Sequence, residues 1–240
     1  TPNDPLFPQQ WGLTKINAPA AWDVVTGTPT VVIALVDSGI DLTHPDLAGR
    51  LWVNPGEVAG NGLDDDNNGF VDDVNGWNFV HGTNNIYDGN GHGTQVAGVA
   101  AATANDGVGI AGLCWNCRIM PVRVMADSGV SNYSDIAAGV IYAADKGAKV
   151  INLSLGGYAY SNALRDAVNY AVSKGAVVVG GAGNDNVATP FYPAAYENVI
   201  AVAATDPDDH KATFSDYGTW VDLSAPGTVI TTTFLGGDWG

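Results

Sequence analysis

The chain has 240 residues, 46% of them hydrophobic, which excludes a disordered chain and suits one domain with its own core. It has 25 acidic and 9 basic residues, a net charge of −16, which argues against nucleic acid or an anionic membrane as a partner. All the acidic residues except Glu57 and Glu197 are Asp, which is typical of turns and metal-binding loops, so the composition favours a cation binder. No apolar run approaches the roughly 20 residues that cross a bilayer. The polar opening TPNDP contains no signal peptide, so for a secreted protein we expect that the targeting segment has been removed.

Short β-branched runs alternate with segments of helical spacing. In chain order they predict strand 30–36, helix 95–104, strand 118–124, helix 133–146, strand 149–155, helix 162–174, strand 176–180 and strand 198–203. This alternation implies right-handed crossovers and a parallel sheet with helices on both faces. The sequence has no internal repeat or low-complexity linker. We therefore expect one α/β domain over residues 1–240, with a mostly parallel, twisted sheet between helices.

Three polar residues flanked by glycine lie near the predicted ends of these elements. His92 lies between two glycines in GNGHGTQVAG, at the start of a helix of small apolar residues. Asp37 follows the strand VVIALV, and Asn184 follows the run VVVGGAG. Each alone is explained by an ordinary role, a satisfied core histidine or a turn residue. Because chemistry collects at the carboxyl ends of parallel strands, their combination predicts an active site.

The segment 54–91 is rich in Gly, Asn and Asp, and loops of this length are usually functional. Within it, DDDNNGFVDD at 64–73 has the opening spacing of an EF-hand calcium loop. Asn75 stands where the bidentate Glu belongs, so we expect a calcium loop of another geometry. The alternative, a solvated acidic turn, is disfavoured because so many carboxylates repel one another without a cation. The predicted oxygen donors are Asp64, Asp66, Asn68, the carbonyl of Phe70, and Asp73.

Five motifs in order, ALVDSGID, GHGTQVAG, INLSLGG, VVVGGAGN and LSAPG, resemble those of the subtilases, the subtilisin-like serine proteases. The resemblance covers nearly all of the chain and implies the subtilisin-like three-layer fold. It also implies that Asp37 orients His92, that His92 is the general base for a serine, and that Asn184 donates a hydrogen bond to the oxyanion.

The same resemblance implies a peptide substrate that binds as an added strand along Gly129, Val130 and Ser131. The cleft for the side chain that precedes the scissile bond would be lined by Ser154, Leu155, Gly156, Ala182 and Gly183. Without the family, an ordinary loop and an ordinary strand end would explain these segments equally well.

A second calcium site follows from the resemblance alone. Its implied ligands are the carboxylates of Asp4, Asp46 and Asp106 and the carbonyls of Thr103, Val108 and Ile110.

The serine of the family lies in a GTS-type motif after the APG segment, which is 225–227 here, and this motif is absent up to Gly240. Ser38, Ser154 and Ser215 belong to other motifs and do not replace it. We therefore expect the 240 residues alone to be inactive, and the serine to lie on a C-terminal segment or a second chain. Without that segment, the apolar side of the His92 helix at Val96, Val99 and Ala100 would be uncovered.

Two short motifs have more than one interpretation. Cys114 and Cys117 in CWNC suit a thioredoxin-like redox pair or half a zinc site, but no further Cys or nearby His completes a metal shell. In a secreted protein a local disulfide is favoured. GVGIAG at 107–112 matches the dinucleotide fingerprint, but it follows a helix and precedes a strand, the reverse of the required order.

The sequence thus predicts a secreted, calcium-stabilised serine endopeptidase that acts on proteins or peptides, with no nucleic-acid or membrane partner. One alternative is a non-catalytic member that binds peptides or calcium. Another, a nucleotide-binding domain, depends on GVGIAG alone.

Overall fold

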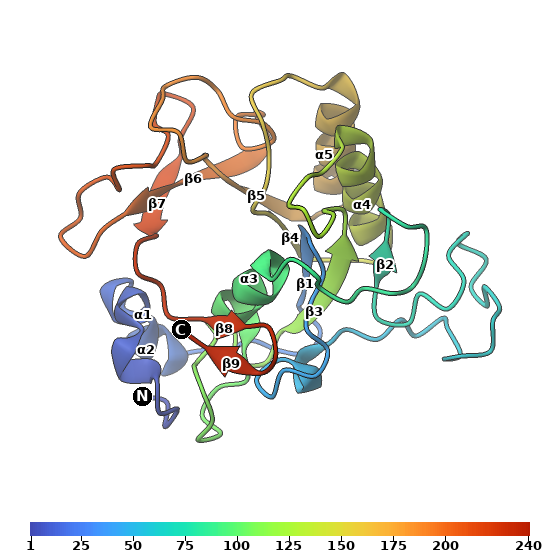
Figure 1. The fold of residues 1–240 in the computed structure, drawn as a ribbon, viewed down its shortest axis with the longest axis horizontal. Coiled ribbons are helices and arrows are strands. Elements are labelled where there is room, and N and C mark those ends of the chain that lie inside the picture. Colours follow the sequence, from blue (N-terminus) through green and yellow to red (C-terminus); the bar gives the residue numbers. More distant parts are fainter.

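The computed structural model describes all 240 residues and is built around a seven-stranded, wholly parallel sheet (Figure 1). The strand order is β2-β3-β1-β4-β5-β6-β7. The strands are β1 Val32–Asp37, β2 Trp77–Asn78, β3 Arg118–Arg123, β4 Val150–Leu153, β5 Val177–Gly181, β6 Val199–Thr205 and β7 Leu223–Pro226. A separate antiparallel hairpin pairs β8 Thr233–Phe234 with β9 Asp238–Trp239.

The principal helices lie on opposite faces of this sheet. On one face α4 and α5 pack side by side, and α3 packs against the other, beside β1 and β3 (Figure 1). The α-helices are α1 Trp11–Lys15, α2 Ala18–Trp22, α3 His92–Ala101, α4 Tyr133–Asp145 and α5 Asn162–Ser173, with short 3₁₀ turns η1 Phe7–Gln9 and η2 Ala48–Arg50. No helix is long and apolar enough to cross a membrane.

The alternation of side chains along β1 divides the core into two layers. Val32, Ala34 and Val36 belong to a 27-residue apolar cluster that includes residues of α4 and α5. Leu35 belongs to a 10-residue cluster beneath α3. Successive strand residues point to opposite faces, so a run that is apolar throughout is covered on both sides. The predicted three-layer α/β fold is confirmed.

The eight predicted elements are all present, with ends displaced by up to three residues. The largest displacement is in α3, which covers 92–101 rather than 95–104. It begins at His92 because Gly91, at a φ of 102°, turns the chain into the helix, and it ends because Ala102 is extended at a ψ of 150°. The two-residue β2 and the polar β7 lack the apolar run that marks a buried strand, so the sequence patterns did not predict them.

Candidate functional site

Asp37 and His92 meet at the carboxyl end of β1. Asp37 is the last residue of the strand and is fully buried. Its Oδ1 accepts hydrogen bonds from the Ser38 N–H at 2.7 Å and from His92 Nδ1 at 2.8 Å. Its Oδ2 is buried with no hydrogen-bond partner. The carboxylate therefore depends on the imidazole to compensate its charge.

The glycine after His92 allows this approach. A Cβ on Gly93 would collide with the carbonyl oxygen of Gly39, in the turn that follows β1. The Gly93 N–H also donates to Ser38 Oγ at 2.8 Å. The first turn of α3 therefore rests directly on the turn after β1, which brings His92 to Asp37.

Asp88, which the sequence analysis did not identify, anchors the start of α3. Its Oδ1 accepts the N–H groups of Asn90 and Gly91, and its Oδ2 accepts the N–H and the hydroxyl of Thr94. Burial alone would raise the pKa of Asp88, but these hydrogen bonds outweigh it and the pKa is lowered. Asp88 lies three residues before the N-cap residue Gly91, outside the position at which a capping side chain is expected, so no local pattern marked it.

The imidazole of His92 is fixed on one side and open on the other. The hydrogen bond to Asp37 raises the pKa of His92 above its usual 6.5, against the opposite effect of burial. The side chain is 40% exposed, and Nε2 makes no hydrogen bond. The ring thus lines a cavity of about 520 Å³ and keeps Nε2 free of hydrogen bonds to the protein.

Asn184 lines the same cavity, together with four of the five residues predicted to line the cleft: Ser154, Leu155, Ala182 and Gly183. Asn184 is exposed, and its side-chain amide makes no hydrogen bond within the protein. The structure therefore places an unengaged amide donor and an unengaged imidazole nitrogen on one cavity.

A second hollow of about 490 Å³ adjoins the first, because Leu155 lines both. Gly129, Ser131 and the fifth cleft residue, Gly156, line it as well, whereas Val130 does not line it and is 64% exposed. A tight hairpin presents this edge, since the Ala126 N–H donates to Val130 O at 2.9 Å. The predicted peptide-binding edge and the predicted cleft are thus contiguous.

The apolar side of α3 is incompletely covered. Val99 is 41% exposed and lines both the His92 cavity and a mostly apolar one of about 190 Å³, while Val96 and Ala100 are half-buried. Ala225 and Pro226 of β7 line the same two cavities. An uncovered apolar wall therefore runs from the helix of His92 to β7.

A model of the subtilase family matches residues 28–238. The chain belongs to the subtilase family of serine proteases. It is 46% identical over 235 residues to thermitase of Thermoactinomyces vulgaris, covering 98% of this subtilase and 76% of thermitase. It is also 46% identical over 237 residues to the thermophilic serine proteinase of Bacillus sp. (strain AK1), covering 98% of this chain but 54% of the relative.

Among solved structures, the fold resembles that of a protease from Pseudoalteromonas arctica PAMC 21717. The TM-score is 0.83 at 31% sequence identity, and the match covers all of this subtilase and 81% of that chain. The resemblance drawn from the five sequence motifs is thus confirmed by the family model, the relatives and the fold.

The first predicted calcium loop forms an acidic cluster that differs in membership from the expected set. Carboxylate oxygens of Glu57, Asp66 and Asp73 lie within 4.8 Å of one another. Asp64 instead accepts the N–H groups of Asn68 and Gly69, at 2.9 and 2.8 Å. Glu57 was missed because it precedes the motif by seven residues and joins it only through the folding of the loop.

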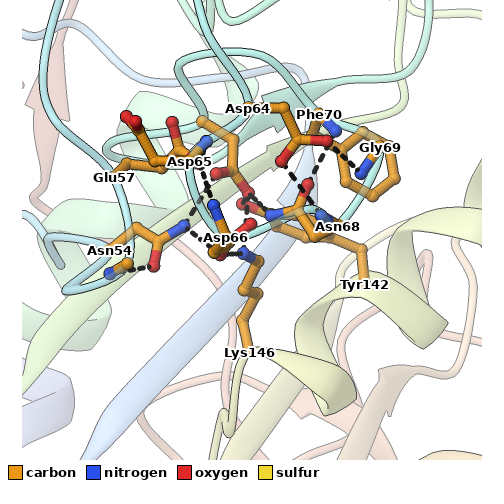
Figure 2. Close-up of polar contacts among 12 residues, drawn as sticks. Asn54, Glu57, Asp64, Asp65, Asp66, Asn68, Gly69, Phe70, Tyr142 and Lys146 are labelled. Atoms are coloured by element: carbon orange, nitrogen blue, oxygen red, sulfur yellow. Dashed lines mark hydrogen bonds and ion pairs between the residues drawn. The ribbon is translucent and has the colours of Figure 1, made fainter.

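A lysine also reaches into this acidic cluster of Glu57, Asp66 and Asp73. Lys146, at the end of α4, points into the loop, with Nζ 2.6 Å from Asp66 and 3.2 Å from Asp73 (Figure 2). Burial would raise the pKa of Asp66, but hydrogen bonds from Lys146 and Asn54 outweigh it and lower the pKa. Tyr142 adds a hydrogen bond to Asp73 at 2.8 Å. The cluster is therefore partly neutralised by the protein itself.

Asn68 and Phe70, the remaining predicted donors, lie beside this cluster. Asn68 Nδ2 donates to Asp73 at 3.1 Å, and its Oδ1 accepts the Phe70 N–H at 2.6 Å. The Phe70 ring packs in an aromatic group with Trp77, Phe79 and Tyr142.

The second predicted calcium set surrounds the turn that follows α3. Asp4 and Asp46 are buried, and in each carboxylate one oxygen, Oδ1, is enclosed without a hydrogen-bond partner. Their other oxygens accept the N–H groups of Asn105 and Ile110, at 2.7 and 3.1 Å. Burial raises the pKa of both Asp4 and Asp46, and the nearby charge of Asp106 adds to the effect. Two enclosed, unpaired carboxylate oxygens are the arrangement that a cation would satisfy.

Thr103 and Val108 each donate a backbone hydrogen bond in this turn. Thr103 donates its N–H to the carbonyl of Asp46 at 2.8 Å, and the Val108 N–H donates to Asp106 at 2.9 Å. The turn is therefore bonded to Asp46 at Thr103 and at Ile110, while the bond to Asp106 lies within the turn.

Cys114 and Cys117 form a close pair, with their Sγ atoms at bonding distance and their Cα atoms 5.5 Å apart. They pack on Gly27, where a Cβ would collide with the sulfur of Cys114.

GVGIAG, residues 107–112, is a loop between α3 and β3 rather than a strand–turn–helix unit. The nucleotide-binding alternative therefore has no structural support.

Proposed function

We propose that this subtilase is a secreted, calcium-stabilised serine endopeptidase, in which Asp37 and His92 are two members of an Asp-His-Ser triad. The single observation that carries the proposal is the His92 Nδ1–Asp37 Oδ1 hydrogen bond of 2.8 Å, with Nε2 open to the cavity that Asn184 lines. Residues 1–240 belong to one catalytic domain in this account, because one sheet supplies both sides of the cavity.

The hydrogen bond to Asp37 determines which proton His92 carries. The carboxylate accepts at Nδ1, so neutral His92 carries its proton there and holds a lone pair at Nε2. Nε2 is then the base that takes the proton of an attacking hydroxyl. The buried carboxylate stabilises the imidazolium that forms, and the raised pKa of His92 records the same preference for the charged ring.

Asn184 supplies the second requirement of peptide hydrolysis. When a hydroxyl attacks a peptide carbonyl, negative charge develops on the carbonyl oxygen, and a preorganised amide donor lowers the barrier. The side chain of Asn184 is free of other hydrogen bonds and lines the cavity of His92, which supports this role.

The contacts of the three serines near these elements support a nucleophile elsewhere, because each hydroxyl is engaged with a partner other than His92. Ser38 Oγ accepts the Gly93 N–H, Ser154 Oγ accepts from Asn152, and Ser215 Oγ bonds with the N–H of Ala204 and the carbonyl of Asp216. No serine hydroxyl is hydrogen-bonded to His92. We therefore assign the nucleophile to a segment outside these 240 residues, downstream or on a second chain. The uncovered apolar wall at Val99, Ala225 and Pro226 supports a segment that packs there.

The substrate in this account is an extended protein or peptide segment. It adds as a strand to the edge at Gly129–Ser131, with the side chain before the scissile bond in the hollow lined by Ser154, Leu155 and Gly183. The contact between the two hollows at Leu155 supports this path.

We assign calcium a structural role in this protein. The set Asp4, Asp46 and Asp106, with the carbonyls of Thr103, Val108 and Ile110, is supported by the enclosed, unpaired Oδ1 atoms of Asp4 and Asp46, although only Glu57, Asp66 and Asp73 bring three carboxylate oxygens within 4.8 Å of one another. Asp66, Asp73 and Glu57 form the second candidate, where Lys146 competes with an ion. Bound calcium would tie the N-terminal segment to the turn after α3 and takes no part in the chemistry.

Secretion is supported by the Cys114–Cys117 pair, because disulfides persist in oxidising compartments.

The test is hydrolysis of a chromogenic peptide by the full-length protein and its His92→Ala variant. We expect the variant to lose about three to six orders of magnitude in kcat, as removal of a triad member does. His210→Ala is the matched control, because His210 is exposed and also lies near a carboxylate, 3.6 Å from Asp206. It should retain wild-type activity. Near-normal hydrolysis by His92→Ala would refute the proposed mechanism.

A further inference from the structure

Asp216, in the connection between β6 and β7, is fully buried and bonded to the loop that carries Asn184. Its Oδ1 accepts the N–H groups of Asp185 at 3.0 Å and Val187 at 2.9 Å. Its own N–H donates to the carbonyl of Gly183 at 3.0 Å. Asp216 thus holds the chain on both sides of Asn184.

Further contacts restrict the loop that carries Asn184. Gly183 has a φ of 107°, and a Cβ there would collide with Asp216 Oδ2, so the carboxylate packs directly against the backbone before Asn184. Two further backbone bonds join the same segments, from Asn186 N–H to Phe214 O at 2.8 Å and from Tyr217 N–H to Val187 O at 3.1 Å. Because the Asn184 amide has no hydrogen bond of its own, this backbone sets its direction.

The second oxygen of Asp216 connects the loop to the cleft wall. Tyr158 OH lies 2.9 Å from Asp216 Oδ2 and 2.6 Å from Asp185 Oδ2. The hydrogen bond with Asp185, burial and the one with Asp216 together raise the pKa of Tyr158, so it stays a neutral donor. Its ring contacts Phe191, which lines the His92 cavity, at 5.2 Å between centroids.

Asp216 forms no ion pair, so its charge is stabilised by hydrogen bonds alone. Bonds to an ionised acceptor are roughly twice as strong as neutral ones. A buried carboxylate that accepts two backbone N–H groups therefore fixes a loop more firmly than a hydroxyl at the same place would.

We propose that Asp216 is a positioning residue for Asn184, holding the loop 183–187 so that the Asn184 amide is aimed into the cavity it shares with His92. The inference rests on the proposed function, in which Asn184 donates to the oxyanion. Asp216 itself touches neither the substrate nor the reacting atoms.

The experiment compares Asp216→Ala, Asn184→Ala, the double variant and the wild-type full-length protein in peptide hydrolysis. Removing one oxyanion donor in subtilisin lowers kcat about 100- to 1000-fold, and we adopt this range for Asn184→Ala. We expect Asp216→Ala to lower kcat by at least about tenfold, with KM changed less than about threefold, because it disturbs a transition-state contact. When Asn184 is already Ala, the further change Asp216→Ala should lower kcat less than about threefold. The effects of two residues that act through one contact are not additive.

Three further variants separate positioning from general stability. Asp216→Asn keeps an oxygen that can accept both N–H groups and should restore most of kcat. Tyr158→Phe removes the hydroxyl that bonds Asp216 Oδ2 and Asp185 Oδ2 but leaves both backbone bonds of Asp216 Oδ1 in place, and should leave kcat within about threefold. Asp222→Ala removes a carboxylate bond of similar length, from the exposed Asp222 to the N–H of Ala201 at 2.8 Å, outside the Asn184 loop. It should lower the melting temperature without lowering kcat.

Amide hydrogen exchange gives a readout that does not need activity. Asp185 and Val187 should exchange faster in Asp216→Ala and at the wild-type rate in Asn184→Ala. Additive kcat losses in the double variant, or unchanged exchange at both amides, would overturn the inference. If the wild type hydrolyses no peptide, the proposed function fails first, and the exchange data still decide whether Asp216 holds the loop.

Discussion

Gly93, in the first turn of α3, lies so close to Gly39 that a side chain on residue 93 would meet the Gly39 carbonyl oxygen. This contact connects the turn after β1 to the helix of His92, and so connects Asp37 to its partner. The geometry of the Asp37–His92 pair therefore depends on a contact between the backbones of two glycines, which have no polar side chain.

Gly93→Ala should consequently damage both stability and activity. The added methyl forces the helix start away from β1, and overpacking of this kind costs about 1–3 kcal/mol. For a chain of this size the melting temperature should fall by about 2–12 °C. Peptidase activity should fall at least about tenfold, because small misplacements of catalytic groups are costly. Gly49→Ala is the control, since a Cβ there meets nothing within 4 Å. Equal behaviour of the two variants would refute the steric account.

The pH dependence should follow the raised pKa of His92. Only the neutral imidazole accepts a proton, so kcat/KM should rise with pH through a pKa above the usual 6.5. Asp37→Asn removes the hydrogen bond to a charged carboxylate, the main cause of the shift, and should move this rise to lower pH while lowering kcat by about four orders of magnitude. If kcat/KM rises over the same pH range in Asp37→Asn as in the wild type, the rise belongs to the titration of a group other than His92.

The raised pKa of His92 affects the stability of the folded protein in the direction opposite to its effect on activity. The folded state binds the proton on His92 more tightly than the unfolded state, so the pair stabilises the fold below the unfolded pKa. That contribution is lost as the pH rises through the raised pKa of the folded state. The enzyme should therefore gain activity over the pH range in which it loses this part of its stability.

Calcium should raise the melting temperature through Asp4 and Asp46. An ion at 100 times its dissociation constant adds about 2.7 kcal/mol, which corresponds to about 5–11 °C here. In Asp46→Asn the shift between calcium and chelator should shrink strongly, because one of the two unpaired buried oxygens is lost. Asp166→Asn, an exposed surface change, should keep the full shift. Identical midpoints of the wild type in calcium and chelator would contradict the site.

Lys146 should compete with calcium at the acidic cluster of Glu57, Asp66 and Asp73. Its ammonium lies 2.6 Å from Asp66, so an ion entering there must displace it. Lys146→Met should tighten calcium binding in isothermal titration by at least about tenfold, since a like charge is removed from the site. Lys174→Met, which removes an exposed lysine 3.4 Å from Asp145, should not change it. Unchanged affinity in Lys146→Met would place the ion elsewhere.

Local signals in the sequence predicted five of the seven sheet strands and the three long helices, whereas the pairing of Asp37 with His92 was predicted from the family resemblance. Apolar runs mark the buried strands, and flanking glycines mark the close approach at residue 93. Glu57, Lys146 and Asp216 could not be predicted in the same way. Each joins its cluster from a distant part of the chain, and nothing in the residues around it distinguishes it from an ordinary surface charge. Asp88 lies outside the usual capping position before α3, and only the folded loop brings its carboxylate to the N–H groups at the helix start.

The central claim, that His92 and Asp37 activate a serine, is tested most directly by a serine-directed phosphonylating probe followed by peptide mass analysis of the full-length protein. We expect one adduct, on a serine outside residues 1–240, that disappears in His92→Ala. An adduct on Ser38, Ser154 or Ser215, or peptide hydrolysis by a wild-type protein that the probe does not label, would contradict it.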